Sequence, residues 1–148
     1  MEVIEKYKRT LEEDPHNGEM LNYLGKLEFK EGQKKEALTH LRKALILKEC
    51  DAEGCYLLGL LYEDRKRYED AIETLHSGLE INPEHHKSLV KLSEFYTNKS
   101  DFDKGLHFAF RGIRIAENAE LCNTIGLCYY GKANKSKKQT EEMLNLAA

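Results

Sequence analysis

Cysteine is the residue type in this chain best suited to metal binding or nucleophilic chemistry. The four cysteines are Cys50, Cys55, Cys122 and Cys128, and no two of them form a C-x-x-C pair. Tetrahedral zinc sites need closely spaced ligand pairs, which this sequence lacks. We therefore interpret Cys55, Cys122 and Cys128 as small packed apolar side chains. Cys50 lies between two expected helices and is predicted to be more exposed and more reactive.

The histidines and carboxylates form no catalytic pattern either. His85 and His86 are adjacent in an expected surface turn, where neighbouring side chains point in different directions and no third metal ligand is evident. The sequence contains no Ser/His/Asp constellation, no glycine-rich phosphate loop and no H-E-x-x-H motif. We therefore predict that the chain is not an enzyme and that it uses no metal and no cofactor.

Charge and hydropathy restrict the class of partner. The 148 residues carry a formal net charge of −3, and only two of them are proline. A general nucleic-acid-binding domain carries a strong positive excess, so we expect no nucleic-acid partner. No stretch approaches the roughly 18 apolar residues of a membrane helix. The first residues lack the basic-then-apolar pattern of a signal peptide, which predicts a cytoplasmic protein with no membrane span.

A repeated spacing of small residues organises the chain. Gly25, Gly59 and Ser93 are 34 residues apart, and Gly126 follows 33 residues later. Further small residues recur 12 and 19 positions after each of the first three, namely Ala37, Ala71 and Gly105, then Ala44, Gly78 and Gly112. Tandem units of this length are typical of repeat proteins, in which each unit buries its apolar face against its neighbours.

This spacing resembles the tetratricopeptide repeat, whose pattern is W-x-x-L-G-x-x-Y, then A-x-x-x-F, then P. The second copy is the most similar and reads Cys55-x-x-Leu58-Gly59-x-x-Tyr62, Ala71-x-x-x-Leu75, Pro83. The resemblance covers about Val3 to Tyr130, and Glu28 departs from it by replacing the tyrosine. It implies an all-α fold, an antiparallel helix-pair solenoid that forms a right-handed superhelix. The first helix of each pair would line the concave side.

The repeats predict a single helical domain over 1–148 with a half-repeat at each end. Val3, Tyr7 and Thr10 have the spacing of a second helix. The expected units are a half-repeat 1–17, full repeats 18–51, 52–85 and 86–118, a half-repeat 119–131, and a basic linker with a C-terminal capping helix in 132–148. Expected helices span 2–13, 18–31, 34–48, 52–64, 68–81, 86–98, 102–116 and 119–131. A ninth helix at Lys137–Leu146, which covers the end of the stack, is favoured over a tail.

The small residues have a steric role in this scheme. Where two helices cross, a position without a large side chain lets the backbones approach. We expect Leu41 to fill the gap at Gly25 and Leu75 to fill the gap at Gly59.

The concave side of the first helices is the predicted binding surface. Its residues recur at three- and four-residue spacing off the packing face. They are Asn22, Lys26, Phe29, Lys30, Tyr56, Leu60, Glu63, Asp64, Val90, Glu94, Asn123 and Leu127. An exposed apolar row usually marks an interaction site. We therefore predict a noncatalytic protein–protein interaction scaffold that binds a peptide or helix of a partner protein, with Phe29, Tyr56, Leu60 and Val90 as anchors.

Two alternatives remain open. The first is a chaperone adaptor with a degenerate carboxylate clamp, in which Lys87 and Lys91 would contact a C-terminal carboxylate. The other clamp positions, Asn22, Lys26 and Leu57, fit that pattern poorly. The second is a structural segment of a larger multiprotein assembly. We also expect a homodimer through the N-terminal half-repeat, either about a two-fold axis or by docking of Lys137–Leu146 from a neighbour.

Overall fold

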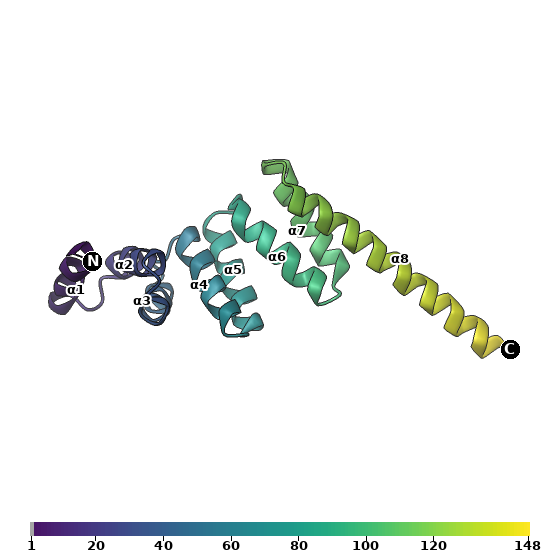
Figure 1. Ribbon diagram of the computed structural model, residues 1–148, viewed down its shortest axis with the longest axis horizontal. Helices are drawn as coiled ribbons and strands as arrows, with labels where there is room; N and C mark the ends of the chain where they lie inside the picture. Colours follow the sequence, from purple (N-terminus) through teal and green to yellow (C-terminus); the bar gives the residue numbers. More distant parts are fainter. Residues whose placement is uncertain (1) are drawn as a thin grey trace. The chain divides into compact units, whose positions relative to one another are not determined.

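The structure is a computed structural model that describes residues 2–148, and these residues form eight α-helices and no strand. The helices are α1 (Glu2–Glu13), α2 (Gly18–Lys30), α3 (Lys34–Ile46), α4 (Ala52–Asp64), α5 (Tyr68–Ile81), α6 (His86–Asn98), α7 (Phe102–Ile115) and α8 (Ala119–Ala147). The first seven agree with the predicted bounds to within two residues (Figure 1). The chain divides into two compact units, residues 1–85 and 86–148.

Polar residues of one repeat phase begin the first helices. Asn17 precedes α2, Asp51 precedes α4 and Asn118 precedes α8, and the side-chain oxygen of each accepts a hydrogen bond from a backbone N–H in the first turn. Such caps satisfy donors that have no partner inside the helix. Two residues after each first helix of a pair comes a turn residue with positive φ, at Gly32 (78°), Lys66 (58°) and Ser100 (61°).

Close helix crossings hold the pairs of the first unit together. A Cβ built on Gly25 would lie 2.6 Å from Cγ of Leu41, and one on Gly59 would lie 3.1 Å from Cγ of Leu75. Both leucines are almost completely buried. The prediction that these leucines fill the glycine gaps is confirmed, and α2 pairs with α3 as α4 pairs with α5.

The second unit is built from α6, α7 and α8. The rings of Tyr96 on α6 and Phe108 on α7 stack with centroids 5.6 Å apart. A Cβ on Gly112 of α7 would meet Leu121 of α8 at 2.9 Å and Cβ of Leu89 at 3.6 Å. The small residue in α7 therefore lets α6 and α8 both approach it.

Lys137–Leu146 is helical as favoured, but the predicted linker and separate ninth helix are wrong, because α8 runs without interruption from Ala119 to Ala147. Ala133 occupies the repeat phase of the positive-φ turn residues, and alanine favours the helix. Lys138 and Glu142 occupy the phases at which the second helices of the first unit carry alanine and leucine. Charged side chains at these positions oppose a fold-back onto the preceding turns of α8.

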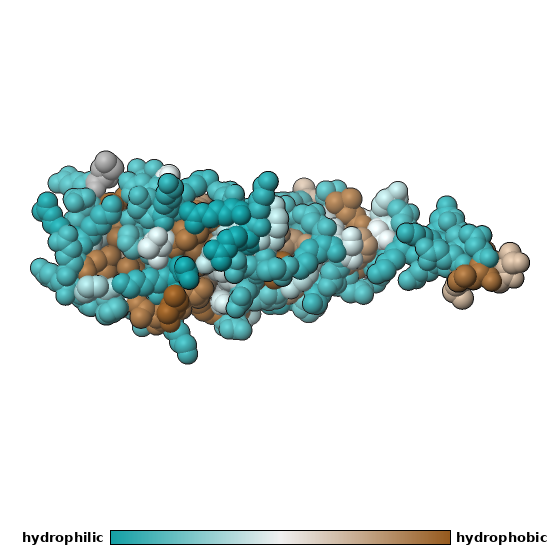
Figure 2. All heavy atoms as spheres, turned by 90° about the horizontal axis from the view of Figure 1, so that it is seen from below, coloured by the Kyte–Doolittle hydropathy of each residue, from teal (hydrophilic) through white to brown (hydrophobic). Residues whose placement is uncertain are grey.

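The end of α8 does not cover the stack. Met143, Leu144 and Leu146 are all exposed, the last to 88%. Figure 2 shows the apolar side chains that gather at this free end of α8.

Glu28 shows how the first unit accommodates a departure from the repeat pattern. It is completely buried, and its Oε2 lies 2.6 Å from Nδ1 of His40 on α3. The Lys8 Nζ lies 4.0 Å from its other oxygen. At Glu28, where the repeat pattern has tyrosine, a polar contact between α2 and α3 therefore replaces the packing of an aromatic ring.

We expect His40→Ala to destabilise the chain by about 1–3 kcal/mol, because it leaves the buried Glu28 carboxylate without this hydrogen bond. Chemical denaturation followed by circular dichroism measures the change. Thr39→Ala is the control, since Thr39 is exposed and adjacent on the same helix. Equal effects of the two substitutions would contradict a stabilising role for the Glu28–His40 contact.

Candidate partner-binding surface

Two neighbouring first helices, α2 and α4, present most of the predicted binding residues in the first unit. We call this set the α2–α4 surface, and it comprises Lys26, Phe29, Lys30, Tyr56, Leu60, Glu63 and Asp64. Lys30 and Asp64 are exposed, and the other five are half-buried. The structure thus brings these seven residues onto adjacent helices that contact each other.

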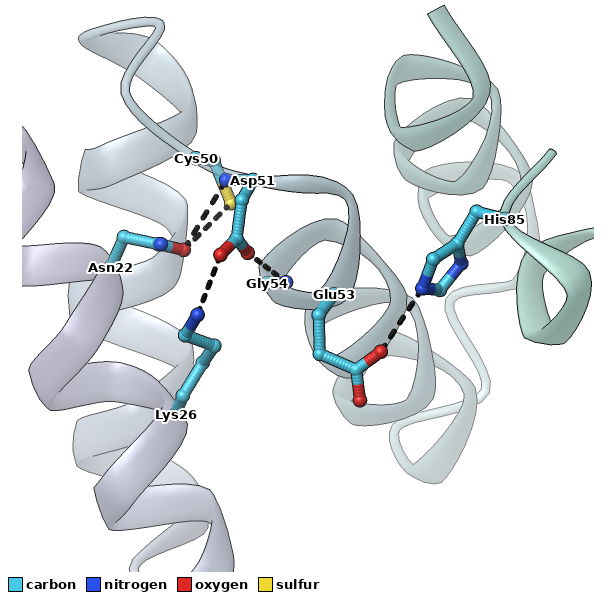
Figure 3. A network of polar contacts seen from close by, with 7 residues as sticks. All are labelled: Asn22, Lys26, Cys50, Asp51, Glu53, Gly54 and His85. Atoms are coloured by element: carbon cyan, nitrogen blue, oxygen red, sulfur yellow. Dashed lines mark hydrogen bonds and ion pairs between the residues drawn. The ribbon is translucent and has the colours of Figure 1, made fainter. Parts of the chain in front are cut away.

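Tyr56 is held in place from the loop that follows α5. Its ring lies 5.9 Å from the ring of His85. The His85 Nε2 lies 3.0 Å from a carboxylate oxygen of Glu53, one turn before Tyr56 on α4 (Figure 3). His85 is therefore a partly buried packing residue of the first unit, whereas His86 begins α6 and does not belong to the turn as predicted.

Asn22 does not line an open surface, which corrects its predicted role. It is only 7% exposed, and its Oδ1 accepts hydrogen bonds from the Asp51 N–H at 3.4 Å and the Cys50 thiol at 3.5 Å. Lys26 donates to Oδ2 of Asp51 at 2.5 Å, while Oδ1 of Asp51 accepts the Gly54 N–H (Figure 3). Asn22 and Lys26 thus connect α2 to the start of α4.

These contacts set the ionisation of Asp51. Partial burial opposes the charge, but hydrogen bonds from Lys26, the Gly54 N–H and Asn22 outweigh it and lower the pKa of Asp51 below its ordinary value. A carboxyl whose pKa is lower in the folded chain stabilises the fold above its unfolded pKa. That contribution disappears as the pH falls through the folded pKa.

We expect Lys26→Met to move the acid-unfolding transition to higher pH. Without the ammonium donor, the folded pKa of Asp51 rises towards its ordinary value, so its stabilisation is smaller and is lost earlier on acidification. Lys30→Met is the control, because it removes the same charge one turn further along α2. The measurement is helicity against pH, and equal shifts for both variants would contradict the coupling of Lys26 to Asp51.

Cys50 is buried rather than exposed and reactive as predicted. Its hydrogen bond with Cys55 and its burial raise the pKa of Cys50. Because the thiolate is the reactive form, Cys50 is protected on both counts. It packs with Leu21, Ala44 and Cys55 in an apolar cluster.

In the second unit the predicted residues lie on α6 and α8. Lys91 donates to Glu94 at 3.1 Å, and its ammonium lies 5.6 Å from the centroid of the Phe95 ring. Lys87 is exposed and Val90 is half-buried. On α8, both Asn123 and Leu127 are exposed.

The exposure of α8 was missed by sequence reasoning. Cys122 is exposed although its repeat phase predicted a packed side chain, whereas Cys55 and Cys128 are buried as expected. Tyr129 is 53% exposed, but Tyr62 at the same phase is 7% exposed. The charged residues at the second-helix positions downstream of Tyr129, Lys138 and Glu142, were the signal that no helix within residues 2–148 folds back over it.

Residues 2–148 contain neither a metal-binding cluster nor a membrane-spanning helix. Within that range, no three histidine, cysteine or acidic side chains come together in a way that could hold a metal ion. No helix in the same range has both the length and the apolar character needed to cross a membrane.

Part of the sequence matches a known repeat family. The tetratricopeptide repeat profile matches residues 52–85. The BBSome complex member BBS4 of Mus musculus is 28% identical over 129 residues, which cover 86% of this chain and 25% of that protein. BBS4 of Bos taurus is 29% identical over 116 residues, or 78% of this chain and 22% of that protein. The chain thus spans about a quarter of the length of these curated relatives.

Solved structures share the helix-pair architecture. The MamA protein is 28% identical with a TM-score of 0.77, over 96% of this chain and 79% of that one. YrrB, described as a tetratricopeptide-repeat protein with an unusual peptide-binding site, is 20% identical with a TM-score of 0.78, over 92% of this chain and 71% of that one. The in-phase helix pairs, the matched repeat and these neighbours show that this chain has the tetratricopeptide-repeat fold.

Proposed function

We propose that the chain is a noncatalytic interaction module that binds a peptide or helix of a partner protein on the α2–α4 surface. One observation carries this proposal. Phe29, Tyr56 and Leu60 stay partly exposed on α2 and α4, while Leu24 and Leu58 on the same helices are completely buried. Partly exposed aromatic and aliphatic side chains on rigid helices are suited to act as binding anchors.

The charges on this surface would orient the bound segment. Lys26 and Lys30 lie on α2, and Glu63 and Asp64 lie at the end of α4. Asp64 already pairs with Lys34 of α3. Complementary charges of this kind contribute to the register and to the rate of association more than to raw affinity.

A role as a subunit segment of a larger assembly is the second candidate. It is favoured by the BBS4 relative, which is described as a complex member and matches 86% of this chain. The peptide-binding description of YrrB favours the first candidate instead. Both candidates use the surface of the helix stack to contact another protein, and they differ in whether the partner segment is an isolated peptide or part of a folded subunit.

The chaperone-adaptor alternative has less support. A carboxylate clamp needs Asn22 and Lys26 to meet an incoming carboxylate, but Lys26 is paired with Asp51 and Asn22 is buried against the start of α4. Leu57 offers no polar group to a carboxylate. An incoming carboxylate would therefore have to compete with Asp51 for the Lys26 ammonium.

The test is selection of binding peptides followed by measurement with two matched double variants. The 148-residue chain is panned against a phage-displayed random peptide library, and the selected peptides are titrated by calorimetry. We expect Tyr56→Ala plus Leu60→Ala to weaken binding at least about tenfold, since each anchor contributes on the order of 1 kcal/mol or more.

The control is Ile46→Ala plus Tyr68→Ala, which removes one aliphatic and one aromatic side chain from exposed positions on α3 and α5. It is expected to leave the affinity unchanged. Peptides that bind both double variants equally well would place the binding site elsewhere. If no peptide is selected, but a folded partner from the source cells is captured and lost only in the first variant, the assembly role is the correct one.

A further inference from the structure

A shallow hollow lies between α3 and α5, the second helices of the two helix pairs in the first unit. It has a volume of about 260 Å³, and Tyr62 of α4, which is only 7% exposed, lies at its floor. We call it the α3–α5 hollow, and its lining includes Arg42, Leu45, Ile46, Tyr62, Asp70 and Glu73. None of these residues belongs to the α2–α4 surface or to the first or last helix of the sequence.

An aliphatic side chain stands exposed at the rim of this hollow. Ile46 is 70% exposed, and the adjacent Leu45 is half-buried, whereas Leu41 one turn earlier on α3 is completely buried. The volume is below the 300–1,000 Å³ or so of typical small-molecule sites. The α3–α5 hollow is therefore suited to a few side chains of a protein segment rather than to a free metabolite.

The two walls of the hollow carry opposite charges. The sequence of α3 contains four lysine or arginine residues and one glutamate, and that of α5 contains four acidic residues and no lysine or arginine. Asp70 is paired with Arg67 of the turn before α5. Within residues 2–148, however, the side chains of Arg42 on one wall and Glu73 on the other have neither a hydrogen bond nor an ion pair. Both charges are thus available to a bound segment.

We propose that the α3–α5 hollow binds an amphipathic helix of a partner protein. The apolar stripe of that helix contacts Leu45 and Ile46. Its acidic residues lie along the edge that faces Arg42, and its basic residues lie along the edge that faces Glu73. This surface is separate from the α2–α4 surface, so the inference goes beyond the proposed function.

Charge complementarity and shape select this occupant. A helix lies readily in the groove between two neighbouring helices. An amphipathic helix also presents an apolar stripe with a separate polar edge on either side, so it can meet an acidic and a basic wall at once. Opposite charges on the two walls then fix the direction in which the helix lies, because the reversed helix would set like charges against each other.

Other occupants fit less well. An extended segment turns alternate side chains towards and away from the surface, so it presents a single row to the hollow and cannot meet both walls. A second copy docked through the same surface would set one hollow against another. Neither copy has a ridge there to enter the other, and a void would remain between them.

The test uses a phage-displayed library of helix-forming peptides. Each peptide has a fixed leucine stripe, and each edge position carries glutamate, glutamine or lysine. The library is panned against the chain with Tyr56→Ala plus Leu60→Ala, so that ligands of the α2–α4 surface are not selected. We expect the enriched peptides to carry glutamate along one edge and lysine along the other. In a fluorescence anisotropy titration, Arg42→Glu should weaken their binding at least about fivefold, because both walls are then acidic.

Charge reversal of one wall at a time gives the sharpest readout. Panning against Arg42→Glu should enrich lysine on both edges, and panning against Glu73→Lys should enrich glutamate on both edges. The matched controls are Lys35→Glu on α3 and Glu80→Lys on α5, which make the same charge changes at exposed positions outside the lining. They should leave the selected pattern unchanged. Circular dichroism verifies that every variant keeps its helix content.

Ile46 distinguishes this surface from the proposed function. Ile46→Ala should weaken the peptides of the α3–α5 hollow at least about threefold, since it removes an apolar contact. The same substitution is expected to leave ligands of the α2–α4 surface unaffected, and Tyr56→Ala plus Leu60→Ala has the reverse pattern. Failure of one proposal therefore leaves the other standing.

Several outcomes would overturn the proposal. They are the absence of enriched peptides, enrichment of peptides without opposite edges, and equal affinity of these peptides for the Arg42→Glu chain. A proline placed in the middle of an enriched peptide should abolish binding, and unchanged affinity would mean that the occupant is extended. Association of the 17.1 kDa chain with itself that is lost in Arg42→Glu would show that a second copy occupies the hollow instead.

Discussion

Replacement of Leu58 with alanine is expected to lower the free energy of unfolding by about 2–5 kcal/mol. Leu58 is completely buried in α4, one residue before the Gly59 crossing. Truncation of its side chain there removes apolar contacts and leaves a cavity that close-packed helices cannot fully fill. Urea denaturation followed by circular dichroism measures the change.

Leu60→Ala is the matched control for this prediction. It removes the same side chain two residues away on the same helix, where Leu60 is half-buried on the α2–α4 surface. The expected decrease in the free energy of unfolding is below about 1 kcal/mol, because less buried apolar surface is lost. Comparable losses at both positions would mean that Leu60 packs in the core and does not belong to the binding surface.

Gly25→Ala is expected to destabilise the chain by about 1–3 kcal/mol, although alanine favours the helix more than glycine does. The new Cβ would lie 2.6 Å from Cγ of Leu41 and 3.2 Å from its backbone nitrogen. Leu41 is completely buried and has little room to move. The α2 and α3 helices would therefore have to separate, and thermal denaturation measures the loss.

Gly126→Ala is the matched control, since it is the same substitution at the same repeat phase. No neighbour among residues 2–148 approaches its Cβ within 4 Å. In dilute solution the change is therefore expected to stabilise the chain by about 0.5–1 kcal/mol through helix propensity alone. The opposite signs of the two effects are the prediction, and a stabilising Gly25→Ala would refute the close crossing of α2 and α3.

Much of the fold could be predicted from the sequence because the repeat is encoded locally. The positions of Gly25, Gly59 and Ser93 set the phase, and seven of the eight helices follow from it to within two residues. Even the pairing of Leu41 with Gly25 is a local property, since both residues belong to one helical hairpin. Contacts between residues of one hairpin follow from helix geometry and a short turn.

The candidate site was predicted less completely, because burial of a polar residue depends on its partners. Asn22 and Lys26 have the spacing of surface residues. However, Asn22 bonds to Cys50 and Lys26 bonds to Asp51, each more than 20 residues away along the chain. Cys50 has acidic neighbours in the sequence that gave no sign of its burial. Pattern alone cannot show which side chain of the next helix will reach a given polar group.

Helices α1 and α8 show which features the sequence determined and which the tertiary structure decided. The sequence by itself determined that α1 has the pattern of a second helix and that the start of α8 has the pattern of a first helix. Only the structure decided that α8 continues straight to Ala147, which leaves Gly126 open and Tyr129 exposed. The physical reason is that continuation of a helix is a local preference, whereas a turn at Ala133 would need apolar contacts that Lys138 and Glu142 do not supply.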